Sequence, residues 1–184
     1  MIDFELMLAN FKTLSTHDRI NLFNSSVSKY IPEKLTKHLI DNKFFEQYAS
    51  SKFHGNYVGG LFDHSYSVML KLVEMTDQLS LNWQNERSPY IIGMLHDLCK
   101  MDEYECIDGV IHRIKDTPII GHGDKSCILL SNFFDLTEEE DMCIRYHMGA
   151  FNVANWDAYG KAIEKYDTVL WTHTADMFVS RLVV

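Results

Sequence analysis

The stretch Gly93–Lys100 reads GMLHDLCK, and it decides how the rest of the chain is interpreted. It places the imidazole of His96 beside the carboxylate of Asp97 on a short apolar segment, and further histidines recur on both sides of it. Histidine and aspartate side chains from separate helices commonly form a metal site in this way. Because a single His-Asp pair is common by chance, the prediction depends on the remaining histidines and carboxylates.

Length and composition predict one domain. The chain has 184 residues, of which 46% are hydrophobic and 23% charged, which is ordinary for a globular protein with a sizeable core. The first residues, Met1–Glu5, lack the basic start and apolar run of a signal peptide, and no later run has membrane-spanning length. We therefore expect a cytoplasmic protein without a membrane partner.

The net charge of −9 indicates the class of partner. A broad basic surface for duplex nucleic acid is not expected, because such binding comes mainly from neutralising phosphates. A small phosphorylated substrate, such as a nucleotide, is compatible with this charge if metal ions and a few lysines or arginines supply positive charge locally. The sequence leaves the oligomeric state open.

The cysteines form no Cys-x-x-Cys pair, so neither a zinc knuckle nor a thioredoxin-like motif is expected. We predict that they are small core residues. They are Cys99, Cys106, Cys127 and Cys143.

Apolar residues recur mostly at helical spacing, which predicts an all-α bundle. One segment differs: residues 104–114 have β-rich flanks around Asp108-Gly109, a strong hairpin signal. A loop with three glycines at residues 53–60 leads toward His64, and Thr137 begins a capping box. Helices are expected at residues 2–11, 18–30, 33–42, 44–49 and 65–81, from Ser88-Pro89 through His96-Asp97, and at residues 122–134, 138–147 and 160–184.

Four of the nine histidines fall near predicted helix ends, where side chains of separate elements can converge. A carboxylate, Asp176, lies in the middle of an otherwise apolar helical stretch, where burial is costly without a cation. A metal ion would supply that cation. The four histidines are His64, His96, His122 and His147.

The ordered set of these histidines with Asp97 and Asp176 resembles the metal-binding pattern of the HD-domain metal-dependent phosphohydrolases. Residues 59–65, GGLFDHS, resemble the Gly-Gly-Leu-x-x-His-Ser/Thr lead into the first ligand. Residues 96–100, HDLCK, resemble His-Asp-Ile-Gly-Lys, with Cys99 in place of glycine. The resemblance implies an HD-domain helical bundle at residues 51–184, with residues 1–50 as a helical cap of the same domain.

In that family, added histidines between the His-Asp pair and the last aspartate accompany a second metal. The resemblance implies that His64, His96, Asp97 and Asp176 hold one ion, that His122 and His147 hold another, and that Asp97 bridges them. The expected cofactors are two divalent transition-metal ions, among manganese, iron, zinc, cobalt and nickel, because imidazole and carboxylate ligands suit these better than calcium. A hydroxide bridging the ions would be the nucleophile.

Two lysines are predicted to stabilise charge on the phosphate. Lys100 falls one turn beyond His96, and Lys125 follows His122 near a helix N-terminus that favours anions; for both, the alternative is a solvated surface residue. His173 is more simply a packed or hydrogen-bonded histidine. The predicted substrate contacts are His54, Arg145, Phe151 and Trp156, and further aromatic candidates for a base pocket are Phe53, Tyr57 and Tyr104.

The predicted function is a metal-dependent phosphodiesterase that acts on a nucleotide or small phosphodiester. The alternatives are a nucleotidase or nucleoside-triphosphate hydrolase, a nucleotide-binding HD protein without turnover, and an oxygenase that activates O₂ at a di-iron site. Metal content and turnover of model phosphoesters would separate these classes.

Overall fold

Helices dominate the computed structural model, which describes residues 10–114, 121–149 and 156–182. A two-stranded antiparallel hairpin, β1 (Tyr104–Ile107) and β2 (Val110–Arg113), is the only sheet in that part of the chain, so the predicted all-α class with a small hairpin is confirmed. Short 3-10 helices, η1 and η2, span Ser28–Tyr30 and Leu98–Asp102. The α-helices are α2 (Thr16–Ser26), α3 (Glu33–Asp41), α4 (Gly60–Leu79), α5 (Ser88–Leu95), α6 (His122–Ser131), α7 (Glu138–Arg145), α8 (Trp156–Lys165) and α9 (Thr168–Leu182).

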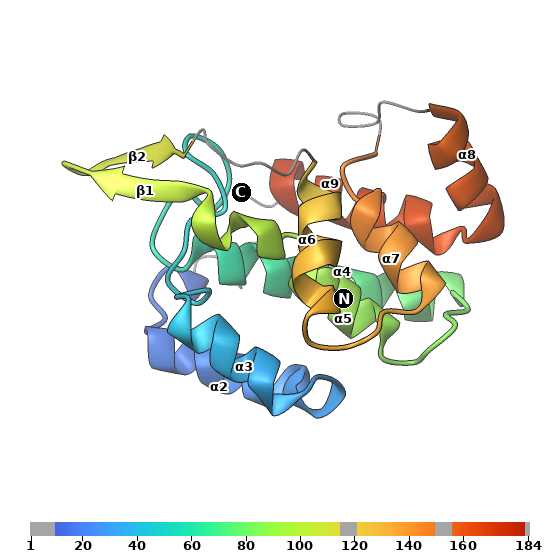
Figure 1. Cartoon of the computed structure of the whole chain (residues 1–184), viewed down its shortest axis with the longest axis horizontal. Coiled ribbons are helices and arrows are strands. Elements are labelled where there is room, and N and C mark those ends of the chain that lie inside the picture. Colours follow the sequence, from blue (N-terminus) through green and yellow to red (C-terminus); the bar gives the residue numbers. More distant parts are fainter. Residues whose placement is uncertain (1–9, 115–120, 150–155, 183–184) are drawn as a thin grey trace.

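Helix α4 is the central element of the bundle. It packs against α2, α5 and α9, while α7 packs against α5, α6 and α9. In Figure 1 the hairpin and α8 lie at opposite ends of the long axis, and α2 and α3 lie along one edge of the view. Within the described residues, no helix combines the length and the apolar character needed to cross a membrane.

The N-terminal helices share one apolar core with α4. Phe23 of α2 meets Phe45 edge-on, with ring centroids 5.4 Å apart, and Phe45 in turn lies 5.4 Å from Phe62 of α4. All of these rings are buried. Residues 44–49, predicted as a short helix, are not helical: a turn extends to residue 46, and irregular backbone follows. Lys43, within this turn, has a left-handed conformation (φ 59°), and Phe44 and Phe45 after it are both buried in the core.

Helix α4 begins earlier than predicted, at Gly60 rather than near residue 65, so His64 lies within its second turn. Gly59 precedes the helix with φ 88°, and a Cβ there would lie 2.3 Å from the Arg19 guanidinium carbon. A Cβ at Gly60 would lie 2.1 Å from the carbonyl oxygen of Gly55. Two consecutive close approaches therefore require the Gly-Gly pair.

A buried ion pair joins α2 to the first turns of α4. Arg19 Nε donates to Asp63 Oδ1 at 2.8 Å and Nη2 donates to Oδ2 at 2.8 Å, and the same guanidinium donates to the carbonyls of Phe11 and Leu14. Burial raises the pKa of Asp63, although Arg19 acts to lower it. The pair fixes α4 directly beside His64.

Helix α5 ends at Leu95, before the predicted His-Asp pair. His96 occupies the C-cap and Asp97, with φ −101° and ψ 20°, leaves the helix and precedes η2. Gly93 lies so close to α4 that a Cβ would be 2.3 Å from the Met69 Cα. This contact brings the end of α5 against α4, and with it His96 toward His64.

The other sequence signals divide into confirmed and corrected ones. Asp108 (φ 50°) and Gly109 (φ 79°) form the predicted hairpin turn, and Thr137 and Glu140 form the predicted capping box. The helices predicted to reach residues 134 and 147 end at Ser131 and Arg145.

The prediction of one continuous helix over residues 160–184 was wrong, because α8 and α9 are separated at residues 166–167. The Tyr166 hydroxyl donates to Glu138 and accepts from Gln84, which holds this residue against α7. The amides of Leu170 and Trp171 both donate to the carbonyl of Asp167, where the new helix begins.

We expect Arg19→Leu to lower the free energy of unfolding by about 3–5 kcal/mol, because it leaves the Asp63 carboxylate buried without its partner. Urea denaturation measures this change. The matched control is Lys37→Leu, which breaks an exposed ion pair with Asp41 and should change stability by no more than about 0.5 kcal/mol. Equal effects of the two variants would contradict the importance of the buried pair.

Candidate metal centre

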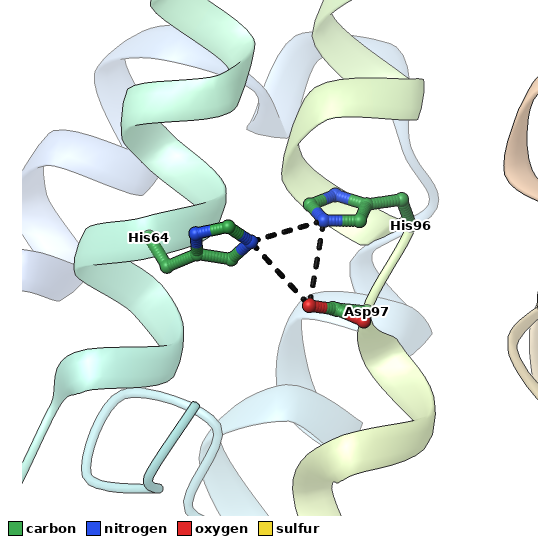
Figure 2. A group of neighbouring side chains, drawn as sticks. All are labelled: His64, His96 and Asp97. Carbon is green, nitrogen blue, oxygen red and sulfur yellow. Dashed lines mark hydrogen bonds and ion pairs between the residues drawn. The ribbon is translucent and has the colours of Figure 1, made fainter. Parts of the chain in front are cut away.

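Side chains from α4 and the end of α5 converge in the interior of the bundle. His64 Nε2 lies 3.2 Å from His96 Nε2, and each of these nitrogens lies 3.4 Å from Asp97 Oδ2. Figure 2 shows the three side chains pointing toward one another between the two helices. All three residues are buried. The predicted His-Asp pair and the first predicted ligand therefore face a common point.

Two further predicted ligands complete this cluster. Asp176 of α9 places Oδ1 3.2 Å from His64 Nε2 and 3.9 Å from His96 Nε2. His147, two residues beyond α7, places Nε2 3.5 Å from Asp97 Oδ1. Two sets of donor atoms lie within 4.8 Å of one another, one from His64, His96 and Asp97 and one from His96, His147 and Asp176. We call these five residues the His/Asp cluster.

Backbone carbonyls orient two of the imidazoles. His96 Nδ1 lies 2.9 Å from the Gly93 carbonyl oxygen, and His147 Nδ1 lies 2.7 Å from the Ile144 carbonyl oxygen. Because a carbonyl oxygen only accepts, Nδ1 must be the protonated nitrogen in both rings. In the neutral ring the lone pair is then on Nε2, which faces the cluster, as in histidines that bind metals.

Three polar atoms of the cluster lack hydrogen-bond partners among the described residues. They are His64 Nδ1, Asp97 Oδ1 and His147 Nε2, and all three are fully buried. A buried polar atom without a partner costs about 1–3 kcal/mol, and more when the group is charged. Asp97 Oδ1 and His147 Nε2 face each other, and a cation bound between this carboxylate oxygen and the imidazole lone pair would satisfy both of them. The residues present therefore fit a metal ion.

The cluster keeps its carboxylates ionised. Burial opposes ionisation of Asp97, but Lys100 and His96 outweigh it and lower the pKa of Asp97 well below its usual range. Burial likewise opposes ionisation of Asp176, and His64 reverses the effect and lowers the pKa of that carboxyl. For His64, burial acts to lower the pKa, but Asp176 and Asp97 raise it above its ordinary value. The centre thus offers two ionised carboxylates as possible metal ligands.

His122, the remaining predicted ligand, lies beside the His/Asp cluster but contacts other residues. It is the first residue of α6, and its Nδ1 is 3.4 Å from Glu103 Oε1 and 3.5 Å from Cys99 Sγ. Donor atoms of His122, Cys99 and Asp97 lie within 4.8 Å of one another. Cys99 and Glu103 were not predicted as part of the site. Cys99 could have been noticed, since it replaces the glycine of the resembling motif.

The two predicted phosphate-binding lysines differ in their placement. Lys100 Nζ donates to Asp97 Oδ2 at 2.7 Å, beside the cluster. Burial disfavours its ammonium form, but Asp97 outweighs burial and raises the pKa of Lys100. Lys125 is also buried, but it pairs with Asp102 rather than with a member of the cluster.

Of the residues predicted to contact substrate, one lies at the cluster and the others do not or cannot be placed. The His54 ring lies over that of His64, with centroids 4.6 Å apart, and burial lowers the pKa of His54 to about 3, so this imidazole is neutral. Arg145 pairs with Asp141 and Asp124 instead of the cluster. Trp156 is 62% exposed on α8, and Phe151 lies outside the described residues.

His173 is a hydrogen-bonded histidine, as predicted. Its Nδ1 donates to the His147 carbonyl oxygen at 2.8 Å, and its ring fills the space over Gly149, where a Cβ would approach within 2.6 Å. It therefore supports the backbone that carries a cluster histidine.

A pocket of about 570 Å³ opens beside the cluster and reaches Asp176 and Lys100. Three of its side chains are cationic, and two of them, Lys52 and Arg181, were not predicted from the sequence. The pocket is lined by Lys52, Phe53, His54, Lys100, Met148, His173, Asp176, Met177, Ser180 and Arg181.

Comparison with protein-family models, curated proteins and solved structures gives no match to this chain. The chemistry of the centre is therefore inferred from its own residues: a buried group of imidazoles and carboxylates that could bind metal, set beside a pocket with positive charge.

We expect added Mn²⁺ or Zn²⁺ to stabilise the folded protein. At an ion concentration of about 100 times Kd the gain is about 2.7 kcal/mol, which raises Tm by roughly 5–10 °C for a chain of this length. Asp97→Asn keeps the shape of the side chain but removes its charge, so it should lose most of this shift. The control Asp77→Asn changes an exposed carboxylate of α4 and should keep it. Equal shifts in both variants, measured by calorimetry, would contradict the centre.

Proposed function

We propose that the chain is a metal-dependent phosphohydrolase of the HD-domain type, and that it cleaves a phosphodiester in a nucleotide or other small molecule. The observation that supports this most directly is the convergence of the His/Asp cluster. Its members come from four separate parts of the chain, in the order that the resemblance implies. The contacts between their donor atoms are 3.2–3.9 Å long.

The cluster offers the ligand types for divalent transition metals, mixed imidazole and carboxylate. Bound ions would supply Lewis-acid polarisation of a phosphoryl oxygen and a water of lowered pKa. The protein's own part is to hold the donors in place. The carbonyls of Gly93 and Ile144 fix two imidazoles, and the Arg19–Asp63 pair fixes the helix that carries His64.

Lys100 is the residue placed to contact the substrate phosphate. Its Nζ is next to Asp97, and its side chain also lines the pocket. An ammonium at this position donates hydrogen bonds to phosphate oxygens whose negative charge grows in the transition state. Because its pKa is raised, Lys100 remains charged at neutral pH and acts as an electrostatic group and not as a base.

The pocket favours a small anionic substrate over a polymer. Its volume of about 570 Å³ is in the range for small-molecule sites. Lys52 and Arg181 add positive charge to a chain whose net charge is −9. Phe53 is 72% exposed at the same pocket and offers an aromatic face on which a nucleobase can stack.

The proposal is tested by metal content and turnover measured together. Purified protein is analysed for metals and assayed with Mn²⁺ on bis-p-nitrophenyl phosphate, p-nitrophenyl phosphate and nucleoside triphosphates, using wild type, Asp97→Asn and the control Asp77→Asn. Diester hydrolysis that requires metal and is lost only in Asp97→Asn supports a phosphodiesterase. If only monoesters or only triphosphates are hydrolysed, the protein is a nucleotidase or a triphosphatase and the phosphodiesterase proposal is wrong.

Two other outcomes would overturn hydrolysis itself. Metal binding with nucleotide binding but no turnover of any ester would indicate a binding protein. Bound iron with a mixed-valent paramagnetic signal and oxygen consumption would indicate an oxygenase.

We expect Lys100→Met to lower kcat by about 10²–10³-fold, because it removes one donor that stabilises transition-state charge. Metal content should stay within about twofold of wild type, since Lys100 is not a ligand. Elemental analysis and the diester assay measure the two quantities on the same sample. Lys37→Met, on the exposed face of α3, is the control and should match wild type. An unchanged kcat in Lys100→Met would exclude the assigned role.

A further inference from the structure

A second group of donor atoms lies next to the His/Asp cluster and includes a sulfur. Its members are Asp97, Cys99 and His122, with one potential ligand atom of each within 4.8 Å of the others. Asp97 and Cys99 are buried and His122 is half-buried. Since Asp97 belongs to both groups, we call the second one the Cys99 group.

The local structure holds the sulfur against α6. Cys99 lies in η2, directly after Asp97 and Leu98, and η2 packs against α6. The Cys99 amide donates to Ser126 Oγ at 3.1 Å, which fixes the backbone that carries the sulfur. Sγ then lies 3.5 Å from His122 Nδ1 at the start of α6. A sulfur and an imidazole are thus placed together by contacts that do not involve the His/Asp cluster.

The two oxygens of Asp97 face different neighbours. Oδ2 contacts His64, His96 and Lys100, at 2.7–3.4 Å. Oδ1 is completely buried without a hydrogen-bond partner among the described residues, and His147 Nε2 lies 3.5 Å from it. One of the two oxygens also lies within 4.8 Å of donor atoms of Cys99 and His122. Since a carboxylate offers about four lone-pair sites on its two oxygens, Asp97 can serve one cation among the histidines and another beside Cys99 and His122.

Glu103 adds a fourth group at this position. Its carboxylate is buried, with Oε1 3.4 Å from His122 Nδ1 and Oε2 3.4 Å from Arg113 Nη2. Glu103 Oε1 and Cys99 Sγ therefore approach the same nitrogen of His122, Nδ1. Glu103 thus adds a buried carboxylate oxygen next to the sulfur and the imidazole of the Cys99 group.

We propose that the second metal ion of this chain is bound by the sulfur of Cys99 together with Asp97 and His122, and that it is a thiophilic ion, zinc before manganese. The inference rests on the proposed metal centre and specifies its second site. His147, which the resemblance also assigns to the second ion, has a donor atom within 4.8 Å of donor atoms of His96 and Asp176.

The chemistry of the donors sets the preference. Sulfur, nitrogen and oxygen ligands together are typical of zinc, with Zn–S near 2.3 Å and Zn–N near 2.0–2.1 Å. Manganese prefers oxygen ligands, and a sulfur ligand selects against it. Coordination replaces the S–H bond by a metal–sulfur bond and releases the proton to solvent, so no oxidant or reductant is required.

Cobalt(II) is the probe that separates a sulfur ligand from a nearby thiol. Wild type, Cys99→Ser, Cys99→Gly and the control Cys127→Ser are titrated with Co²⁺ while metal stoichiometry and the near-ultraviolet sulfur-to-cobalt charge-transfer absorption are recorded. Cys127 is a buried cysteine of α6 that hydrogen-bonds to the Asp141 carbonyl. We expect the absorption in wild type and Cys127→Ser and its loss in both Cys99 variants.

Zinc gives a second readout that does not depend on activity. Zinc-loaded wild type should show one sulfur scatterer at about 2.3 Å by X-ray absorption. Both Cys99 variants should bind the second zinc at least about tenfold more weakly, while the first ion is kept.

The outcomes distinguish a failure of this inference from a failure of the proposed metal centre. If wild type binds Co²⁺ without the sulfur band, Cys99 is only a hydrogen-bond neighbour of His122, and the inference fails while the metal centre stands. The inference fails in the same way if Cys99→Ser keeps the band. If wild type binds no Co²⁺, the metal centre fails, and the inference fails with it.

Discussion

The burial of the Asp97 carboxylate is the constraint on which the rest of the centre depends. Its residue is only 2% exposed, and a carboxylate in such a place is costly without positive charge and hydrogen bonds. Lys100 compensates one oxygen, and imidazoles from α4, α5 and the segment after α7 approach the group from other sides. The elements that pack around the short turn after α5 thus compensate the charge of the buried Asp97 carboxylate as well as forming the apolar core.

The placement of that turn explains how one carboxylate can serve two groups of ligands. Had α5 continued through Asp97, successive residues would have followed one helical path, and Asp97 and Cys99 would project in widely different directions. Because the helix ends at Leu95 and a 3-10 helix follows, His96 turns toward α4 while Cys99 turns toward α6. Asp97 lies between them in the chain, and its carboxylate has donor atoms of both groups within 4.8 Å.

The sequence predicted which residues assemble better than it predicted where helices end. Asp176 could be found because a carboxylate in an apolar helical stretch is costly to bury, and that cost is visible in the sequence. His64 and His96 could be found because they fall near predicted helix ends, in segments that resemble a known metal-binding motif. The early start of α4 depends on Gly59 and Gly60 meeting Arg19 and Gly55, contacts that span distant parts of the chain. The break between α8 and α9 contains neither glycine nor proline and depends on hydrogen bonds to α7. Lys125 could not be distinguished from Lys100, because only the tertiary structure pairs it with Asp102.

The charge of the whole chain and the charge of the pocket have opposite signs, and only the second concerns a ligand at close range. Beyond about 10 Å, salt screens the field of exposed carboxylates on the surface. Lys52, Lys100 and Arg181 line one pocket, where an anion that enters it can accept charge-assisted hydrogen bonds. A net charge of −9 therefore disfavours a long polyanion that contacts much of the surface more than it disfavours a compact anion in the pocket. For the phosphohydrolase that we propose, size would then decide among phosphorylated substrates, because a compact substrate avoids the repulsion of the surface.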